Sequence, residues 1–342
     1  MIAEAPLGHR PEVRIDRSDV GRRVSARRIS ELVDGRPVFR DVIGVLTSWD
    51  DHALTVVPRN CEPVSFAEKL LVAGKTVPLF PARRAPLPAA GPAELQRLAA
   101  RCWPALEQEP LGGWTLRASA GYTRRANSAQ ALGDPGRPLP EALAAVRDWY
   151  AARGLPALVE VTVPGSSEDL TAELDRQGPR LAATLVRTAS LAPLVRLGGG
   201  YERVRLSRTA GPAWQSLYQR AAGASPEVEQ AARRVLHGGP SIWFATVPAP
   251  AGSPEGSTPA AIGRCVVDGP WAFFSAIETA PYARRTGLAT TVTAVLAARA
   301  AEEGATGGCL QVEAENTAAT ALYDRLGFTT SHTYHYARLS QP

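Results

Sequence analysis

The sequence predicts an α/β (α+β) fold with a mixed central sheet in its larger part, preceded by a small β-barrel. Two observations predict this organisation. Helical and β-like segments alternate from residue 93 onward. Between Val20 and Val77 only short β-like runs occur, with turn signals between them. The chain has 342 residues, of which 45% are hydrophobic and 21% charged, so it is long enough for more than one folded domain.

The N-terminal part divides into a tail and a barrel. Residues 1–13 contain Pro6, Gly8 and Pro11 without periodicity, which predicts a loose tail. Residues 14–80 are expected to form an SH3-like β-barrel, with turns at Asp34-Gly35 and Asp50-Asp51. Its predicted strands are Arg22–Ile29, Val38–Trp49, Ala53–Val57, Val64–Phe66 and Leu70–Val77.

A proline-rich linker, residues 81–92, precedes the second block, residues 93–191. Helical periodicity and β-like runs alternate in this block. The predicted helices are Glu94–Trp103, Pro140–Arg153 and Ser167–Gln177. The predicted strands are Trp114–Ala118, Ala126–Leu132, Leu158–Val163 and Leu181–Leu191.

The third block, residues 200–342, follows the boundary signal Gly198–Gly200. Its predicted strands are Tyr201–Leu206, Ile242–Val247, Ala261–Val267, Trp271–Thr279, Gly308–Glu313 and Thr333–Leu339. Its predicted helices are Pro212–Ala222, Pro226–His237, Gly287–Glu303 and Thr317–Leu326. Because both blocks end with helix, strand, helix and strand, we interpret the second as a degenerate repeat of the third.

Composition and charge exclude several classes of protein. No apolar run reaches the length of about 20 residues that a membrane-spanning helix needs, and the start of the chain does not resemble a signal peptide, so we expect a cytoplasmic protein. The net charge of +5 is spread among interleaved acidic residues, which argues against a nucleic-acid binder. An alternative is a nucleic-acid interface formed by arginines of the first barrel strand: Arg22, Arg23, Arg27 and Arg28.

The cysteines and histidines do not indicate a metal site. Four cysteines lie far apart without a Cys-x-x-Cys pair, which is typical of buried free thiols in a reducing compartment. The close pair His332 and His335 lacks further ligands at suitable spacing. We therefore expect no metal cofactor.

The segment most informative about chemistry is the turn between a predicted strand and a predicted helix at residues 281–289. The strand ends at Pro281, Arg284 and Arg285 follow, and the helix opens at Gly287. Free N–H groups and the positive end of the helix dipole favour a phosphate here, and the two arginines add charge-assisted hydrogen bonds. The alternative interpretation is an ordinary glycine-containing helix start with solvated arginines.

A second motif decides between these interpretations. The predicted strand around Val312 leads into the helix that starts near Asn316, with the pattern Asn-x-x-Ala-x-x-Leu-Tyr-x-x-x-Gly-Phe ending at Phe328. Both motifs, in this order and at this separation, resemble the GCN5-related N-acetyltransferase (GNAT) superfamily. The resemblance covers residues 200–342 and implies a catalytic GNAT domain. The complete layout resembles actinobacterial proteins with an SH3-like barrel and a two-lobed GNAT region, in which the second block is a degenerate GNAT-like lobe.

The resemblance assigns roles toward acetyl-CoA, the co-substrate. The pyrophosphate would bind the turn formed by Arg284, Arg285, Thr286, Gly287, Leu288 and Ala289. The backbone of Ile277 and Thr279 would pair with the pantetheine arm, and Asn316 would bond near the thioester end. Tyr323 would give a proton to the departing CoA thiolate. The structural alternatives are a helix N-cap for Asn316 and a core aromatic for Tyr323.

The general base is where the sequence departs from the family pattern. One position that is usual for this carboxylate holds Gln311, and a glutamine cannot accept the proton of the amine. The remaining local candidates are Glu278 and Glu313; a water chain or an amine of low pKa would also serve.

The resemblance implies an N-acetyltransferase that moves an acetyl group directly to a primary amine of a small molecule, amino acid or protein. The alternative is a non-catalytic acyl-CoA-binding regulator whose barrel contacts a protein or nucleic acid. A substrate cleft between the lobes could be lined by Trp114, Tyr122, Arg124, Arg125 and Asn127. Ordinary core or surface roles are the simpler interpretation of these residues. The acceptor stays unidentified, and monomer and homodimer are both compatible with the sequence.

Overall fold

The computed structural model describes residues 12–33, 35–58, 62–77, 86–197, 200–250, 252–254 and 257–340. The chain divides into two compact units: residues 1–83 with the short segments 200–202 and 301–304, and the remainder. Several predicted features lie outside the described residues: residues 1–11 of the tail, Asp34 of the first turn, Cys61, residues 81–85 of the linker, and Gly198 and Gly199 of the boundary.

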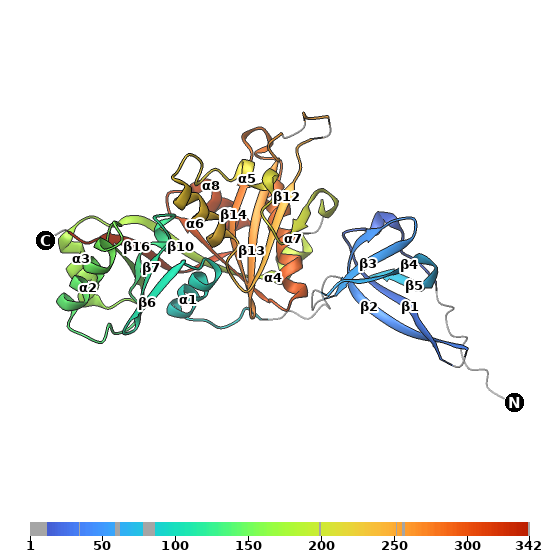
Figure 1. Ribbon diagram of the computed structural model, residues 1–342, viewed down its shortest axis with the longest axis horizontal. Coiled ribbons are helices and arrows are strands. Elements are labelled where there is room, and N and C mark those ends of the chain that lie inside the picture. The colour runs from blue at the N-terminus through green and yellow to red at the C-terminus, as the bar shows by residue number, and fades with distance from the viewer. Residues whose placement is uncertain are drawn as a thin grey trace. The chain divides into compact units, whose positions relative to one another are not determined.

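The first unit contains a five-stranded antiparallel sheet in the order β4-β3-β2-β1-β5 (Figure 1). Its strands are β1 (Arg23–Val33), β2 (Arg36–Trp49), β3 (Ala53–Pro58), β4 (Val64–Ala67) and β5 (Leu71–Thr76). Val24, Leu46, Leu54 and Val56 form a completely buried core. All five predicted strands are present, and the sheet is consistent with a barrel-like domain. Its assignment to the SH3-like class stays a prediction.

The second unit is built on a mixed eleven-stranded sheet in the order β11-β12-β13-β14-β15-β10-β16-β9-β8-β7-β6. The strands of residues 93–191 are β6 (Glu107–Leu111), β7 (Trp114–Ala118), β8 (Ala129–Gln130), β9 (Leu158–Val163) and β10 (Leu181–Ser190). The later strands are β11 (Arg205–Ser207), β12 (Ser241–Val247), β13 (Ala261–Asp268), β14 (Trp271–Thr279), β15 (Gly307–Glu313) and β16 (Thr329–Arg338).

The strands of residues 93–191 form one half of this sheet and those of residues 200–342 the other, and each half contains the last strand of the other. Strand β10 lies between β15 and β16 and is antiparallel to both. On its other edge, β16 pairs with β9 of the first half through Thr333–Arg338. Residues 93–191 and 200–342 therefore share one continuous sheet, and the element order predicted for the repeat is present in both.

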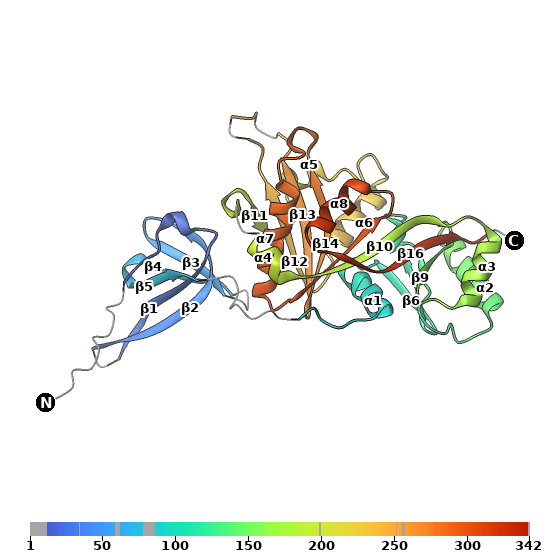
Figure 2. The ribbon, with the colours of Figure 1, turned by 180° about the vertical axis from the view of Figure 1, so that it is seen from behind.

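The helices cover both faces of the sheet (Figures 1 and 2). They are α1 (Pro92–Cys102), α2 (Leu139–Ala151), α3 (Glu168–Gln177), α4 (Leu191–Arg196), α5 (Pro212–Leu217), α6 (Pro226–Leu236), α7 (Leu288–Glu302) and α8 (Thr317–Arg325). Helices α1, α5 and α6 pack against side chains such as Phe273, Val266 and Ile262, and we call this side the α1 face. Helices α7 and α8 lie on the opposite side, the α7 face.

Several elements differ from the sequence prediction. The strand predicted at Tyr201–Leu206 is a 3-10 turn, Tyr201–Arg203, followed by the short strand β11, and helix α4 was not predicted. The strand predicted at Ala126–Leu132 is reduced to β8, because a 3-10 turn occupies Arg124–Ala126. Strand β6 was not predicted, since four of its five residues are exposed and one is Pro110, which an edge strand tolerates. The helix predicted to reach Ala222 ends at Leu217.

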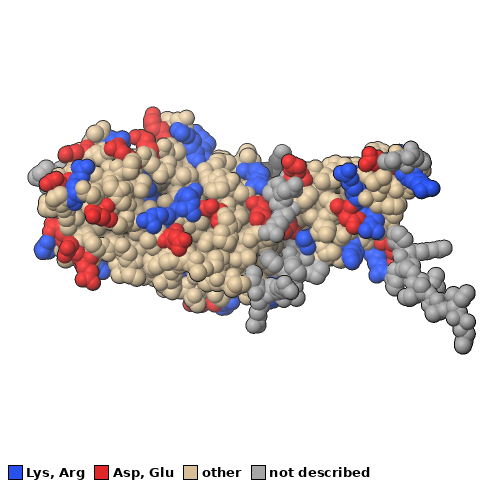
Figure 3. Space-filling model, turned by 90° about the horizontal axis from the view of Figure 1, so that it is seen from below, with Lys and Arg blue, Asp and Glu red and all other residues tan. Residues whose placement is uncertain are grey.

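The surface carries charges of both signs. On the face shown in Figure 3, acidic and basic side chains are interspersed, with wide areas of uncharged residues between them. Among the described residues, no helix has the length and hydropathy needed to cross a bilayer.

Candidate active site

Strands β14 and β15 begin as a parallel pair and then separate. Their pairing runs from Trp271 and Gly307 to Phe274 and Leu310, although β14 continues to Thr279 and β15 to Glu313. Beyond Phe274 the β15-facing backbone groups of β14 have no strand partner among the described residues. The predicted residues Ile277 and Thr279 belong to this unpaired segment, which we call the splay.

A β-bulge in β14 accompanies the splay. The register between β13 and β14 shifts between Ile262 and Arg264, and Ala276 has φ +50°. Ile277 points to the α7 face, where a Cβ on Gly263 would lie 2.8 Å from its Cδ1 and 2.5 Å from Val292 Cγ1. Gly263 therefore permits this close packing of the bulge against α7.

The turn from β14 to α7 exposes the residues predicted to bind pyrophosphate. A 3-10 turn, Pro281–Ala283, follows the strand, and Thr286 Oγ1 donates to the carbonyl oxygen of Ala283 at 2.6 Å. Gly287 has φ +82°, a left-handed conformation that favours glycine, immediately before α7 begins at Leu288. Arg284 and Arg285 are exposed and form no ion pair with the described residues. The first turn of α7 and both guanidinium groups are thus available to an anion.

Helix α8 places Tyr323 against the splay from the α7 face. Tyr323 packs edge-on to Phe328 at 5.6 Å between ring centroids, and Phe328 packs on Phe274 at 6.3 Å. Phe274 is the last residue of β14 that pairs with β15. The Tyr323 hydroxyl has no hydrogen-bond partner within the described chain, and burial raises the pKa of Tyr323 to about 12. The phenol is therefore protonated near neutral pH and free to donate.

Asn316 is the N-cap of α8. Its side-chain oxygen accepts a hydrogen bond from the backbone N–H of Ala319 at 3.1 Å. Asn316 therefore does act as a helix N-cap, which was the structural alternative to a ligand-binding role. A role toward the thioester end of a ligand stays a prediction.

Both candidate base carboxylates lie on the α1 face, opposite Tyr323. Glu278 pairs with Ile262 in the sheet, and its Oε1 accepts from Arg220 Nε at 3.3 Å. Glu313 is exposed at the end of β15, and strand alternation places it on the side of Gln311. The two carboxylates therefore flank the splay from β14 and from β15.

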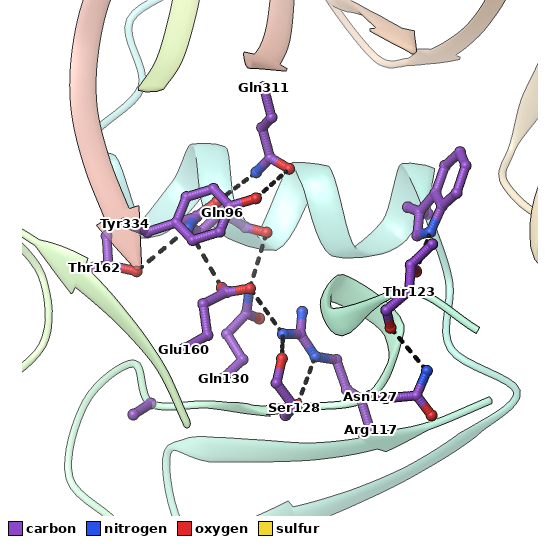
Figure 4. Close-up of polar contacts among 12 residues, drawn as sticks. Gln96, Arg117, Thr123, Asn127, Ser128, Gln130, Glu160, Thr162, Gln311 and Tyr334 are labelled. Carbon is purple, nitrogen blue, oxygen red and sulfur yellow. Dashed lines mark hydrogen bonds and ion pairs between the residues drawn. The ribbon is translucent and has the colours of Figure 1, made fainter. Parts of the chain in front are cut away.

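Gln311 belongs to a chain of hydrogen bonds that the sequence did not predict (Figure 4). The Tyr334 hydroxyl donates to Gln311 Oε1 at 3.2 Å, and Gln311 Nε2 donates to Gln96 Oε1 at 2.8 Å. Gln96 Nε2 in turn donates to Glu160 Oε1 at 3.3 Å. These hydrogen bonds thus connect β15 and β16, through α1, with a carboxylate on β9.

Glu160 is the buried carboxylate at the end of this series of hydrogen bonds. Its side chain is 1% exposed and forms an ion pair with Arg117, which is 2% exposed, at 2.9 Å. Gln130 Nε2 also donates to it at 3.0 Å. Arg117 also donates from Nε to the carbonyl oxygen of Ser128 at 3.0 Å and from Nη2 to its hydroxyl at 2.8 Å. Every oxygen of this carboxylate is therefore hydrogen-bonded.

A cluster of aromatic and arginine side chains lies beside these hydrogen bonds on the α1 face. Trp103 stacks on Tyr122 at 6.2 Å, and the hydroxyl groups of Tyr122 and Tyr218 are 2.8 Å apart. The guanidinium carbons of Arg125 and Arg264 lie 5.7 and 5.1 Å from the ring centre of Trp103. We call Trp103, Tyr122, Arg125, Tyr218 and Arg264 the arginine cluster. Of these, the sequence indicated only Tyr122 and Arg125.

Comparison with known proteins identifies the family. Residues 93–337 match the family described as "Probable histone acetyltransferase Rv0428c C-terminal". The chain belongs to this acetyltransferase family. Two curated relatives agree: an uncharacterized N-acetyltransferase, YobR of Bacillus subtilis strain 168, is 28% identical over 71% of this chain and 96% of its own length. The probable histone acetyltransferase Rv0428c of Mycobacterium tuberculosis H37Rv is 27% identical over 93% of this chain and 94% of its own.

Solved structures agree on the fold. A GCN5-related N-acetyltransferase from Kribbella flavida superposes with a TM-score of 0.52 at 16% identity, covering 74% of this chain and 98% of its own. A tandem GNAT protein from the clavulanic acid biosynthesis pathway superposes with a TM-score of 0.50 at 13% identity, covering 75% of this chain and 91% of its own. The predicted GNAT fold and the predicted acyltransferase class are confirmed.

Proposed function

We propose that the protein transfers an acetyl group from acetyl-CoA directly to a primary amine. The observation that carries the proposal is the splay of β14 and β15 next to the glycine turn that opens α7. Unpaired strand groups suit the amides of pantetheine, and the helix start suits a pyrophosphate. Both features are in one strand–turn–helix segment, so one extended thioester ligand could contact both.

In this proposal the turn residues 284–289 bind the pyrophosphate and the backbone of Ile277 and Thr279 pairs with the pantetheine arm. Asn316 bonds near the thioester end while it caps α8. The thioester carbonyl then lies in the splay, between Tyr323 on the α7 face and the acceptor on the α1 face. Donor and acceptor thus approach from opposite sides of the sheet.

The reaction forms a C–N bond between the amine and the carbonyl carbon and breaks the C–S bond. Tyr323 gives its proton to the departing thiolate. The proton of the amine passes to Glu278 or Glu313, directly or through water. Gln311 cannot accept this proton, but its amide is held by Gln96 and Tyr334 and lines the same side of β15.

The proposal is tested by measuring free CoA release from acetyl-CoA with a panel of amines, and acetyl-CoA affinity by calorimetry. We expect release above the rate without acceptor for at least one amine. Gly287→Glu should abolish acetyl-CoA binding, because a carboxylate enters the phosphate site. Gly269→Glu is the matched control, since Gly269 also has a positive φ and open space but lies in the hairpin before β14. Unchanged affinity in Gly287→Glu would refute the site, and binding without transfer to any amine would favour the regulator alternative.

A further inference from the structure

The arginine cluster lies across the splay on the α1 face. On the β14 side, Arg264 Nη1 donates to Ser275 Oγ at 3.2 Å, one residue after the last pair with β15. On the β15 side, Tyr334 donates to Gln311, and the charge of Arg125 interacts with Tyr334. Because Ser275 and Gln311 follow Phe273 and Cys309 by two residues each, all four side chains point to the α1 face.

The cluster carries positive charge without matching carboxylates. Arg264 is 0% exposed and donates only to neutral partners: the carbonyl oxygens of Leu236 and Gly238, both at 2.7 Å, and Ser275. Burial lowers the pKa of Arg264 to about 10, so it stays protonated at neutral pH. Arg125 forms no ion pair with the described residues.

The carboxylates near the cluster are already engaged. Glu278 accepts from the exposed Arg220, and Glu160 is bound by Arg117, Gln96 and Gln130. In addition, Arg125 Nε is buried and has no hydrogen-bond partner. A buried donor without a partner costs free energy that a bound acceptor atom would restore.

These charges favour one class of acceptor. An oxyanion gains charge-assisted hydrogen bonds from a guanidinium, and the gain is larger in a partly desolvated site. A peptide rich in lysine and arginine would instead meet like charges. The aromatic rings of Trp103, Tyr122 and Tyr218 pack in the same cluster and introduce no negative charge.

We propose that the acceptor is an amine that also carries an oxyanion, a carboxylate or a phosphate, and that Arg125 binds this group. The inference rests on the proposed acetyl transfer and specifies its acceptor. Arg264 contributes to the positive field, and Arg125 makes the direct contact. The amine of such an acceptor then lies over the splay, between Glu278 and Glu313.

The test compares acceptors that differ only in the oxyanion, with the full-length protein and acetyl-CoA. The pairs are phenylalanine against phenethylamine, alanine against ethylamine, and phosphoethanolamine against ethanolamine. A lysine-rich histone-tail peptide serves as the acceptor of opposite charge. We expect kcat/KM to be at least about tenfold higher for the oxyanion member of a pair. The carboxylate and phosphate pairs identify which oxyanion is bound.

Arg125→Gln should lower kcat/KM for the preferred acceptor about 10- to 100-fold, mainly through KM, and leave acetyl-CoA affinity and neutral amines unchanged. Arg125→Lys should restore part of the loss. Arg124→Gln is the matched control, because Arg124 is the exposed neighbour and should change nothing. Equal or better transfer to neutral amines or to the histone peptide would overturn this inference and leave the proposed function standing. Transfer to no amine at all would overturn both.

Discussion

Removal of the Glu160 carboxylate is the sharpest test of the buried hydrogen bonds that connect Glu160, Gln96 and Gln311. Glu160→Leu leaves the guanidinium of Arg117, 2% exposed, with only Ser128 as a partner. It also removes an acceptor from Gln96 and from Gln130. A buried ion pair that loses one partner typically costs about 3–5 kcal/mol of unfolding free energy. We expect a loss in this range.

Two further variants make the magnitude interpretable. Glu107→Leu is the matched control, because Glu107 and Arg153 form an ion pair at 3.0 Å in which the glutamate is 58% exposed. Such exposed pairs contribute about 0–1 kcal/mol. Arg117→Met combined with Glu160→Leu removes the unpaired charge, so the double variant should be more stable than Glu160→Leu by about 2 kcal/mol.

The assay is urea unfolding followed by tryptophan fluorescence. Six of the seven tryptophans, all except Trp49, belong to the unit that contains Glu160, so the signal reports its unfolding. A loss below about 1 kcal/mol in Glu160→Leu, equal to that of the Glu107 control, would refute the reasoning.

Two other predictions concern protons. Tyr323→Phe should lower turnover at least about tenfold with little change in acetyl-CoA affinity, because it removes only the donor to the thiolate; parental rates in steady-state kinetics would reduce Tyr323 to a core aromatic. Burial lowers the pKa of His332 from 6.5 to about 4, so the unfolded chain binds the extra proton first as the pH falls. Its contribution to stability is complete above pH 6.5 and is lost between pH 6.5 and 4. The slope of unfolding free energy against pH in this window should therefore flatten in His332→Phe, and an unchanged slope would contradict the assignment.

The features that local sequence dictates were predicted well. Gly287 ends the turn and opens α7 as expected, because its left-handed conformation is a local requirement. Asn316 caps α8 for a similarly local reason. Strands with a clear apolar pattern, such as β9, were found within their predicted bounds.

The features that long-range pairing dictates were not predicted. The contact between Gln96 and Gln311 joins residues 215 positions apart, and Tyr122 meets Tyr218 across 96 positions. Both depend on the exchange of β10 and β16 between the halves of the sheet, and hydrophobic periodicity carries no information on which strands become neighbours. In the sequence, Arg264 is one polar residue in an apolar strand. Only the fold shows that its carbonyl partners come from the end of α6 and from Gly238 just after it.

A crystal structure of the protein with CoA bound would test the central claim most directly. Our account predicts that the pyrophosphate accepts hydrogen bonds from backbone N–H groups of residues 285–289, and that the pantetheine amides pair with β14 at Ile277 and Thr279. The thiol would then point into the splay next to Tyr323. CoA bound away from the splay, or β14 and β15 closed into a continuous pair beneath it, would contradict the account.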